Sequence, residues 1–243
     1  MQMYRWKFMI YDTLAHYYDA LVKDDEATQA WVDWIEKEKP GKKVLELACG
    51  SGEITYQLAN AGYEMTALDL SSEMIERAKE KDTEHKVQFH VQNMLDLNQF
   101  SVFDTILCLC DSFNYLLENE EVTTFFQQVS SHLHEGGLFF FDMHSWDRLE
   151  EFSEEFNETG SFEDGCQCQW SIMSEDEFVY QDFAFYKDNQ MVQEHHIQRV
   201  YDPEWIQNEL EKYFEILKIT TDFDQQGLCE GEKYFYICKK KGN

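Results

Sequence analysis

Apolar residues along the chain occur in two alternating patterns, short continuous runs and runs with helical spacing, which is typical of an α/β protein. The continuous runs predict buried strands at 44–47, 65–70, 87–91, 103–110 and 138–142. Two further extended segments, at 214–221 and 234–240, lie near the C-terminus. We therefore expect a mostly parallel sheet with helices on both faces.

Residues with helical spacing separate these runs. Ile54 and Leu58 fall on one face of a helix that Gly62 ends, and Ser71 is placed to cap the next helix. The pair Gly136-Gly137 is expected to end a later helix. The remaining helices are predicted at 11–21, 31–38, 122–133 and 205–213.

The segment at 44–52, VLELACGSG, joins the first strand to the first helix through a glycine turn. Gly50 and Gly52 let the backbone approach a ligand closely. Asp69 ends the second strand, where an acidic residue accepts hydrogen bonds from ribose hydroxyls. The third glycine of a dinucleotide site is missing, because Thr55 stands there. A nucleoside ligand without a phosphate is therefore favoured over a pyrophosphate, with an ordinary turn as the alternative.

Glu46-x-Ala48-x-Gly50-x-Gly52 resembles the first motif of class I S-adenosylmethionine (SAM) dependent methyltransferases, with alanine in place of the usual first glycine. The resemblance covers about 11–145 and the C-terminal segments. It implies a Rossmann-like, seven-stranded sheet ending in an antiparallel hairpin, and S-adenosyl-L-methionine as cofactor. Glu46 can face this cationic ligand.

The resemblance also implies which residues contact SAM. Tyr11 or Tyr18 would close over the cofactor, where an aromatic face gains about 1 kcal/mol from a sulfonium, although both could instead pack a helix. Met74 would lie against the adenine, and Asn93 and Met94 beside its edge. The expected cofactor-contacting residues are Tyr11, Tyr18, Glu46, Ala48, Cys49, Gly50, Gly52, Asp69, Leu70, Met74, Asn93, Met94 and Cys110.

The segment at 111–116, DSFNYL, follows the fourth strand, and open α/β sheets bind ligands at the carboxyl ends of strands. It is similar to a subset of methyltransferases that act on small molecules. Asp111, Tyr115 and His144 are the candidate catalytic residues. An amine acceptor needs only to arrive deprotonated, whereas a hydroxyl needs a base. Asp111, His144 and one of the paired histidines His195 and His196 remain open for that role.

The composition changes after the fifth strand. Between Asp147 and Asp188 there are 13 acidic residues, and Arg148 and Lys187 are the basic ones. Extended segments at 166–172, 178–186 and 192–201 predict three antiparallel strands. We expect 1–145 and 203–243 to form the cofactor-binding core and 146–202 an inserted antiparallel β lid over the acceptor site. Docking of a protein partner is the alternative use.

Charge and cysteine content limit the kinds of substrate, compartment and metal site that are expected. The 243 residues carry a net charge of −28, with 48 acidic against 20 basic residues, which disfavours a nucleic-acid substrate. No segment has the length and apolarity of a membrane span or an export signal, so we expect a cytoplasmic protein. Seven cysteines argue against a disulfide framework. The Cys-x-Cys pairs at 108 and 166 lack zinc-site spacing, so we expect packed strand cysteines and no metal.

These observations predict an enzyme that transfers the methyl group of SAM to an N, O or C nucleophile of a small-molecule acceptor by in-line displacement. Two alternatives stay open at this point. A NAD-dependent oxidoreductase would use the same strand, glycine turn and Asp69. A non-catalytic module would bind SAM and use its acidic insert to dock a protein.

Overall fold

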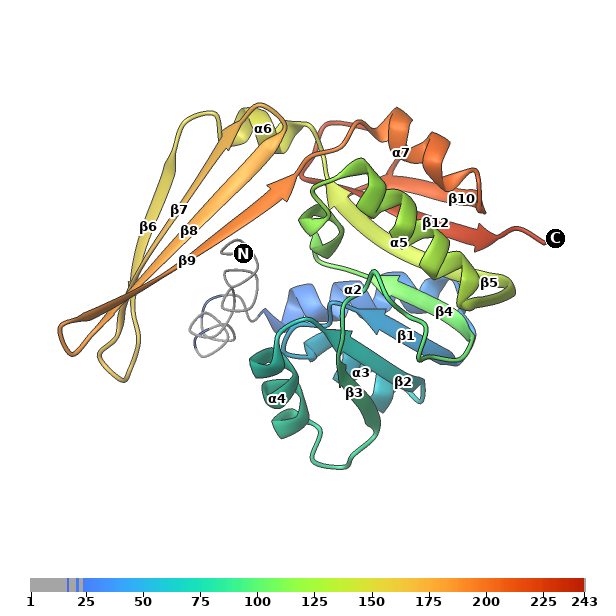
Figure 1. The fold of residues 1–243 in the computed structure, drawn as a ribbon, viewed down its shortest axis with the longest axis horizontal. Coiled ribbons are helices and arrows are strands. Elements are labelled where there is room, and N and C mark those ends of the chain that lie inside the picture. The colour runs from blue at the N-terminus through green and yellow to red at the C-terminus, as the bar shows by residue number, and fades with distance from the viewer. Residues whose placement is uncertain (1–16, 18–20, 22–23, 243) are drawn as a thin grey trace, which may run out of the picture.

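The computed structural model contains a large β-sheet covered by helices on both faces and a smaller sheet that extends away from it (Figure 1). The structure describes Tyr17, Leu21 and residues 24–242. The predicted helix at 11–21 lies mostly outside these residues, and Tyr11 and Tyr18 lie outside them entirely.

The strands of the large sheet follow the order β11-β10-β12-β5-β4-β1-β2-β3. Strands β1 to β5 are parallel, whereas β12, β10 and β11 are antiparallel. Their bounds are β1 Lys43–Leu47, β2 Glu64–Asp69, β3 Val87–Val91, β4 Phe103–Cys108, β5 Leu133–His144, β10 Phe214–Thr221, β11 Gln225–Gln226 and β12 Lys233–Lys240. The predicted Rossmann-like fold class is confirmed, and the eighth strand, β11, is a two-residue polar addition beside β10.

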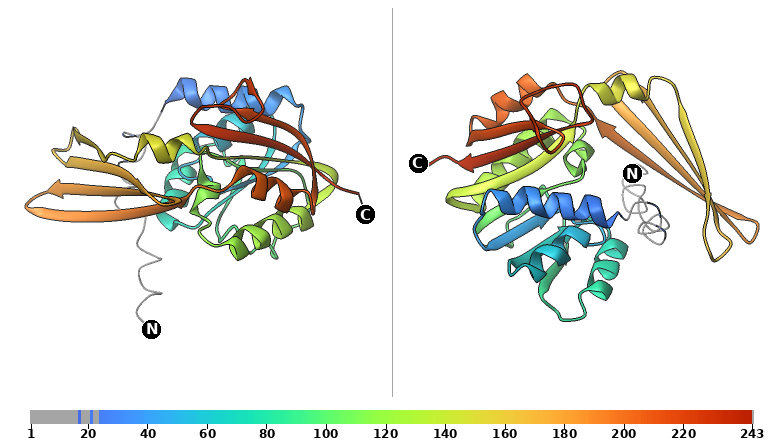
Figure 2. Two further views of the ribbon diagram at one scale, coloured as in Figure 1. Left: turned by 90° about the horizontal axis from the view of Figure 1, so that it is seen from above. Right: turned by 180° about the vertical axis from the view of Figure 1, so that it is seen from behind.

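Helices cover the two faces of the large sheet (Figure 2). Apolar side chains of α2 (Asp25–Lys37) and α3 (Glu53–Asn60) pack in one core cluster, and those of α5 (Asn119–Ser131) and α7 (Pro203–Leu210) pack in another. The other helices are α4 (Ser72–Lys81), α6 (Asp147–Glu151) and the 3-10 helix η1 (Ser112–Tyr115). None of the helices within 24–242 combines the length and apolarity that crossing a membrane requires.

Side-chain caps set where several helices begin. Ser71 caps α4 as predicted, because its hydroxyl accepts a hydrogen bond from the Met74 N–H at 3.2 Å. Asp202 caps α7 in the same way and Pro203 occupies the first turn. Asp24 accepts hydrogen bonds from two N–H groups of α2. This cap explains why α2 begins at Asp25 rather than at residue 31, where its apolar face begins.

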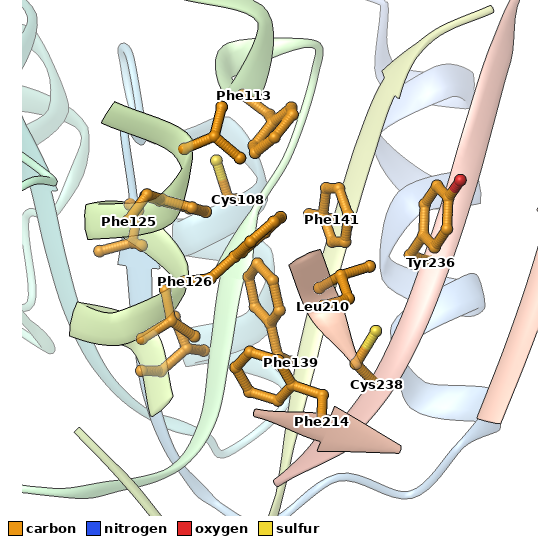
Figure 3. Close-up of a cluster of buried hydrophobic side chains, with 14 of the residues drawn as sticks. Cys108, Phe113, Phe125, Phe126, Phe139, Phe141, Leu210, Phe214, Tyr236 and Cys238 are labelled. Atoms are coloured by element: carbon orange, nitrogen blue, oxygen red, sulfur yellow. The ribbon is translucent and has the colours of Figure 1, made fainter. Parts of the chain in front are cut away.

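The larger core cluster combines several phenylalanines with leucines and smaller apolar side chains (Figure 3). Phe139 and Phe141 stack on β5 with ring centroids 4.9 Å apart, and Phe126 of α5 lies against both. All three are fully buried, and each such side chain contributes about 1.5–3 kcal/mol through removal of apolar surface from water. This packing fixes β5 and therefore the position of Asp142 and His144 at its end.

The predicted role of Gly136-Gly137 is wrong. Helix α5 already ends at Ser131, and the glycine pair lies inside β5. Gly136 has φ +74°, and a side chain at Gly137 would come within 2.9 Å of the Asp104 carbonyl oxygen. The pair therefore serves an irregular stretch of strand, where the pairing of β4 with β5 shifts register, rather than a helix end.

The small sheet has the order β6-β7-β8-β9 and all its pairs are antiparallel. Its strands are β6 Phe156–Ser161, β7 Gln167–Glu175, β8 Phe178–Lys187 and β9 Gln190–Arg199. We expected three strands. Strand β6 was missed because all its residues are exposed and its sequence, FNETGS, lacks the alternation that marks a half-buried strand.

One face of the small sheet is buried toward the end where β6 turns into β7. The Tyr17 ring stacks on Phe162 and Phe185, with centroids 4.2 and 5.4 Å away, and its hydroxyl donates to Asp164 at 3.0 Å. The Cys166 and Cys168 side chains are buried beside them, as expected for packed strand cysteines. The small sheet is thus held by N-terminal residues as well as by its own chain connections.

Candidate functional site

Strands β1 and β4 are neighbours in the sheet. From β1 the chain continues to β2, toward one edge of the sheet, and from β4 it continues to β5, toward the other edge. Such a switch of direction opens a crevice at the carboxyl ends of the two strands. The glycine turn follows β1 here, and the segment at 110–115 follows β4. The Ser112 hydroxyl donates to the Ala48 carbonyl oxygen at 3.5 Å, which brings the two predicted site segments together.

The glycine turn has the left-handed backbone that its sequence suggests. Ala48, Gly50 and Gly52 have φ values of 53°, 55° and 79°. A side chain at Gly52 would come within 3.0 Å of Ala78 on α4, whereas one at Gly50 would meet no atom within 4 Å and would extend into open space. Gly52 therefore permits close packing of α3 on α4, while Gly50 leaves room for a ligand beside the backbone.

Asp69 fixes this turn from the neighbouring strand. Its Oδ2 accepts a hydrogen bond from the Gly50 N–H at 2.8 Å, and its Oδ1 accepts one from the Ser71 N–H at 2.9 Å. Burial raises the pKa of Asp69, while these N–H groups act to lower it. Each oxygen keeps a second lone pair, so the carboxylate can brace the turn and still accept from ribose hydroxyls.

Glu46 lies below the turn and is buried. Its Oε2 accepts a hydrogen bond from the Thr55 hydroxyl at 2.6 Å. Burial raises the pKa of Glu46 to about 7, the Thr55 hydrogen bond lowers it, and the charge of Asp69 raises it. A nearby cationic group would favour the ionised form, which is consistent with the predicted proximity to the cofactor.

The other predicted cofactor contacts differ in exposure. Leu70 is 47% exposed at the end of β2, Cys110 is exposed, and Cys49 is partly exposed within the turn. Asn93 is exposed, but its Oδ1 already accepts from the Leu95 N–H at 2.8 Å. Met94 packs against the core, and Met74 lies on the buried face of α4 with only 2% of its surface exposed. Met74 therefore offers no open surface to an adenine in this conformation.

Strand β4 ends at Cys108, two residues before the predicted end. Cys110 and Asp111 instead take left-handed conformations, with φ 56° and 52°. The expectation that Cys110 packs within the strand beside Cys108 is therefore wrong, because the backbone leaves the sheet between them. This sharp turn directs the Asp111 N–H toward β5, where Asp142 accepts its hydrogen bond, and the Asp111 carboxylate toward β12, where Lys233 donates to it.

An ammonium group lies between two carboxylates at this edge. Because β12 is antiparallel to β5, its first residue Lys233 pairs with His144, the last residue of β5. Lys233 Nζ lies 2.5 Å from Asp111 Oδ1 and 3.4 Å from Asp142 Oδ2. Asp142 Oδ2 also accepts from the Asp111 N–H at 2.8 Å. We refer to Asp111, Asp142 and Lys233 as the carboxylate–lysine cluster.

The ionisation of this cluster follows from its contacts. Burial would raise the pKa of Asp111, but Lys233, His144 and Gln198 together lower it to about 2. Asp142 is fully buried, and burial raises its pKa to about 6 against the opposing effect of Lys233. The two carboxylates raise the pKa of Lys233 despite its burial. Near neutral pH, Asp111 and Lys233 therefore form an ion pair.

The small sheet reaches this edge through the inner face of β9. Gln198 is fully buried and contacts both Asp111 and His144. Two residues earlier, His196 Nδ1 lies 3.2 Å from the Tyr115 hydroxyl. His195 points to the opposite face, where it is exposed and pairs with Asp182. The structure thus places Asp111, Tyr115, His144 and His196 at the same edge. Only one of the paired histidines is among them, because successive side chains of a strand point to opposite faces.

Sequence reasoning did not identify Lys233, Asp142 or Gln198 as site residues. Asp142 carried a signal, since it is an acidic residue at the end of a very apolar strand. Lys233 could be found by noticing that an antiparallel last strand begins at the edge where the parallel strands end. Gln198 carries no local signal, because its role depends on how the small sheet folds back onto the core.

Asp69→Ala should weaken binding of SAM by about 10-fold or more, since one lost charge-assisted hydrogen bond is worth roughly 1.5–3 kcal/mol. The reason is twofold, because the variant removes the carboxylate that we expect to accept from the ribose and leaves the Gly50 N–H without its partner Asp69. Isothermal titration calorimetry with SAM measures the effect. Asp96→Ala, at an exposed loop carboxylate, is the matched control and should bind SAM like the native protein. Native affinity in Asp69→Ala would contradict this placement of the cofactor.

Comparison with known proteins gives a consistent result. Residues 44–137 match a family model described as a methyltransferase domain. A provisionally assigned methyltransferase of Geobacillus sp. (strain WCH70) is 32% identical, covering 96% of this chain and 100% of its own length. The provisionally assigned methyltransferase YqeM of Bacillus subtilis (strain 168) is 33% identical, covering 96% of this chain and 98% of its own.

A solved structure shows the same architecture. The crystal structure of an S-adenosylmethionine-dependent methyltransferase from Clostridium acetobutylicum ATCC 824 superimposes with a TM-score of 0.82 and is 28% identical in sequence. The match covers 96% of this chain and 99% of that one, so it includes the small sheet as well as the large one.

Proposed function

Because this chain belongs to the class I SAM-dependent methyltransferases, we propose that it methylates a small-molecule acceptor held between the switch point of the large sheet and the inner face of the small sheet. The observation that carries this proposal is the contact of β9 with the β4 and β5 ends, where Gln198 meets Asp111 and His144. Family membership sets aside the oxidoreductase alternative.

The residues at hand fit the cofactor. The open space at Gly50 suits close approach of a ligand chain, Asp69 retains lone pairs for hydroxyl donors, and Glu46 is a buried carboxylate that a cation would stabilise. When bound, SAM supplies a methyl group on a positively charged sulfur, and the protein positions the acceptor, excludes water and provides a base where the acceptor carries a proton. Ala48, Cys49 and Gly52 complete the proposed cradle.

Three side chains are proposed to handle the acceptor. Asp111 and Tyr115 frame the end of β4, and His144 ends β5. Asp111 is ionised and shared between Lys233 and Gln198, so it is suited to orienting a polar or cationic group. Tyr115 offers a hydroxyl for hydrogen bonding beside His196. His144 offers a neutral imidazole, because burial lowers its pKa.

We propose that residues 146–202 form the lid, and that 1–145 and 203–243 form the cofactor-binding core. A site lined by the buried polar side chains His144, His196 and Gln198 suits a small acceptor better than a protein surface. The net charge of −28 favours a neutral or cationic acceptor over an anionic one. Protein docking on the acidic lid remains the second use, and the experiment below separates the two.

The lid role is tested with substitutions on opposite faces of β8. Phe183 lies on the inner face against His196, with centroids 5.5 Å apart, and Tyr180 lies on the outer face. Phe183→Ala should lower methyl transfer at least 10-fold while changing SAM affinity less than about threefold, since a lost aromatic contact costs over 1.4 kcal/mol. Tyr180→Ala should retain native transfer rates.

The measurement is transfer of labelled methyl from SAM to a panel of small primary and secondary amines, amino sugars and alcohols, beside a size-fractionated extract. Labelled products confined to the small-molecule fraction would support the proposal. Labelling of proteins alone would overturn the small-molecule acceptor, and SAM binding without any labelled product would favour a non-catalytic module. Equal loss of SAM affinity and transfer in Phe183→Ala would contradict the lid role.

A further inference from the structure

The side-chain amide of Gln198 is buried and makes four hydrogen bonds. Its Nε2 donates to Asp111 Oδ2 at 2.7 Å and to the Asp111 carbonyl oxygen at 3.2 Å. Its Oε1 lies 3.0 Å from His144 Nε2 and accepts from the Gln181 amide at 2.9 Å. Both ends of the amide are therefore fully used, because its nitrogen binds Asp111 twice and its oxygen binds both His144 of β5 and Gln181 of β8.

The chemistry of Asp111 determines which way this amide points. Lys233 Nζ, at 2.5 Å from Oδ1, holds the Asp111 carboxyl as a carboxylate, which can only accept hydrogen bonds. A flipped amide would place the Gln198 oxygen against two acceptor oxygens of Asp111, and the resulting repulsion excludes that arrangement. The Gln198 oxygen must therefore face His144.

The tautomer of His144 follows from the same reasoning. Gln198 Oε1 has no hydrogen to give, so the 3.0 Å contact exists only if His144 Nε2 carries the proton. Burial lowers the pKa of His144, which disfavours a second proton on the ring. Nδ1 is then an unprotonated acceptor, and within residues 24–242 it is buried without a hydrogen-bond partner. A buried acceptor left unpaired costs about 1–3 kcal/mol, which a donor on a bound molecule would recover.

We propose that Gln198 is a positioning residue that fixes His144 as its Nε2–H tautomer, so that the Nδ1 lone pair takes the proton from an O–H or N–H group of the methyl acceptor. In this step, the bond from the acceptor atom to the methyl carbon forms as the methyl–sulfur bond breaks. The electron pair of the broken bond stays on sulfur, and the proton of the acceptor moves to Nδ1.

This assignment favours His144 over two other candidate bases, Asp111 and His195, and it narrows the chemical class of the acceptor. Asp111 is a weak base, because Lys233 and Gln198 oppose the effect of burial and lower its pKa to about 2. His195 is excluded by its position on the outer face. An oxygen or nitrogen nucleophile that still carries a proton uses the Nδ1 lone pair, whereas an unactivated carbon does not. The inference rests on the proposed methyl transfer for its chemistry, but the tautomer itself can be measured without turnover.

The test compares the native protein with Gln198→Met and Gln193→Met in ¹⁵N-histidine NMR spectra at neutral pH. Methionine keeps the length of glutamine but removes the amide. Gln193→Met is the matched control, because Gln193 is an exposed residue on the outer face of the same strand β9 and contacts neither Gln198 nor His144 within the described residues. We expect the native protein and the control to show His144 with protonated Nε2 and unprotonated Nδ1. Gln198→Met should show a mixture of tautomers, since the next acceptor, Asp111 Oδ2, lies 3.9 Å from Nε2.

Transfer to the amine and alcohol panel should fall at least about 10-fold in Gln198→Met and remain within about threefold of native in the control, a difference of 1.4 kcal/mol in transition-state stabilisation. Calorimetry with SAM should give the native affinity in all three proteins. A protonated Nδ1 in the native protein, or an unchanged tautomer or rate in Gln198→Met, would overturn the inference. Absence of SAM binding or of any transfer by the native protein would instead reject the proposed function, while the tautomer measurement would stand.

Discussion

Gly50→Arg should abolish detectable binding of SAM, with an affinity loss of at least about 100-fold, or 2.8 kcal/mol. Gly50 adopts φ +55°, its N–H is held by Asp69, and a side chain there would extend into the open space beside the turn. A large side chain would occupy the volume that the cofactor needs. Its cationic end would also repel a sulfonium group. Calorimetry with SAM and S-adenosylhomocysteine, which lacks the positive sulfur, separates the steric part from the electrostatic part.

Gly62→Arg provides the control for backbone strain. Gly62 has φ +88° and also has no atom within 4 Å of an added side chain, but it lies at the other end of α3. Both variants therefore incur the left-handed penalty of about 1–2 kcal/mol in stability, and only one blocks the proposed site. We expect Gly62→Arg to bind SAM with native affinity. Similar affinity in the two variants, at matched thermal stability, would place the cofactor elsewhere.

Local signals in the sequence were enough to predict the strands, the helix cap and the turn that surround the proposed cofactor site. The strand at 87–91, the Ser71 cap and the second strand ending with Asp69 depend on periodicity and on residues adjacent in the chain. The same holds for the glycine turn, because a left-handed backbone needs glycine, or a tolerated alanine at 48, at fixed positions. These features can therefore be predicted without knowing how the rest of the chain folds.

The acceptor half depends on contacts between residues that are far apart in the chain. Lys233 reaches Asp111 across 122 positions and Gln198 reaches it across 87, so neither contact leaves a local pattern. Their existence follows from strand order and register, which periodicity does not determine. Strand β6 was missed for a different reason, since an exposed edge strand needs no apolar alternation.

Lys233→Met should destabilise the protein by about 3–5 kcal/mol at neutral pH, because it removes the counterion of the fully buried Asp142 and of Asp111, whose side chain is 25% exposed. The native ion pair is fully formed over the neutral range. Burial tends to raise the pKa of Asp111 but Lys233 lowers it to about 2, so the stability that this ionised group contributes is lost only as the pH falls toward 2. Lys233 has a raised pKa, so its contribution is lost only at strongly alkaline pH.

Without the ammonium group, burial should raise the pKa of both carboxyl groups. The folded variant would then bind protons more tightly than the unfolded chain, so its stability should rise as the pH falls from 7.5 toward 5. Native Asp142, whose pKa burial raises to about 6, gives the native protein a smaller rise in the same direction. The difference in free energy of unfolding between the two proteins should therefore be larger at pH 7.5 than at pH 5. Chemical denaturation at the two pH values measures it.

Lys218→Met is the matched control on the adjacent strand β10. Lys218 pairs with Glu38 at 3.5 Å, and both side chains are about one-third exposed. Such a surface pair is worth at most about 1 kcal/mol, and its loss should change little between the two pH values. A pH-independent loss in Lys233→Met, or a loss no larger than that of Lys218→Met, would mean that the carboxylate–lysine cluster is solvated rather than buried. Asp111 would then titrate as an ordinary surface carboxylate. The orientation of the Gln198 amide, which depends on the negative charge of Asp111, would no longer be fixed.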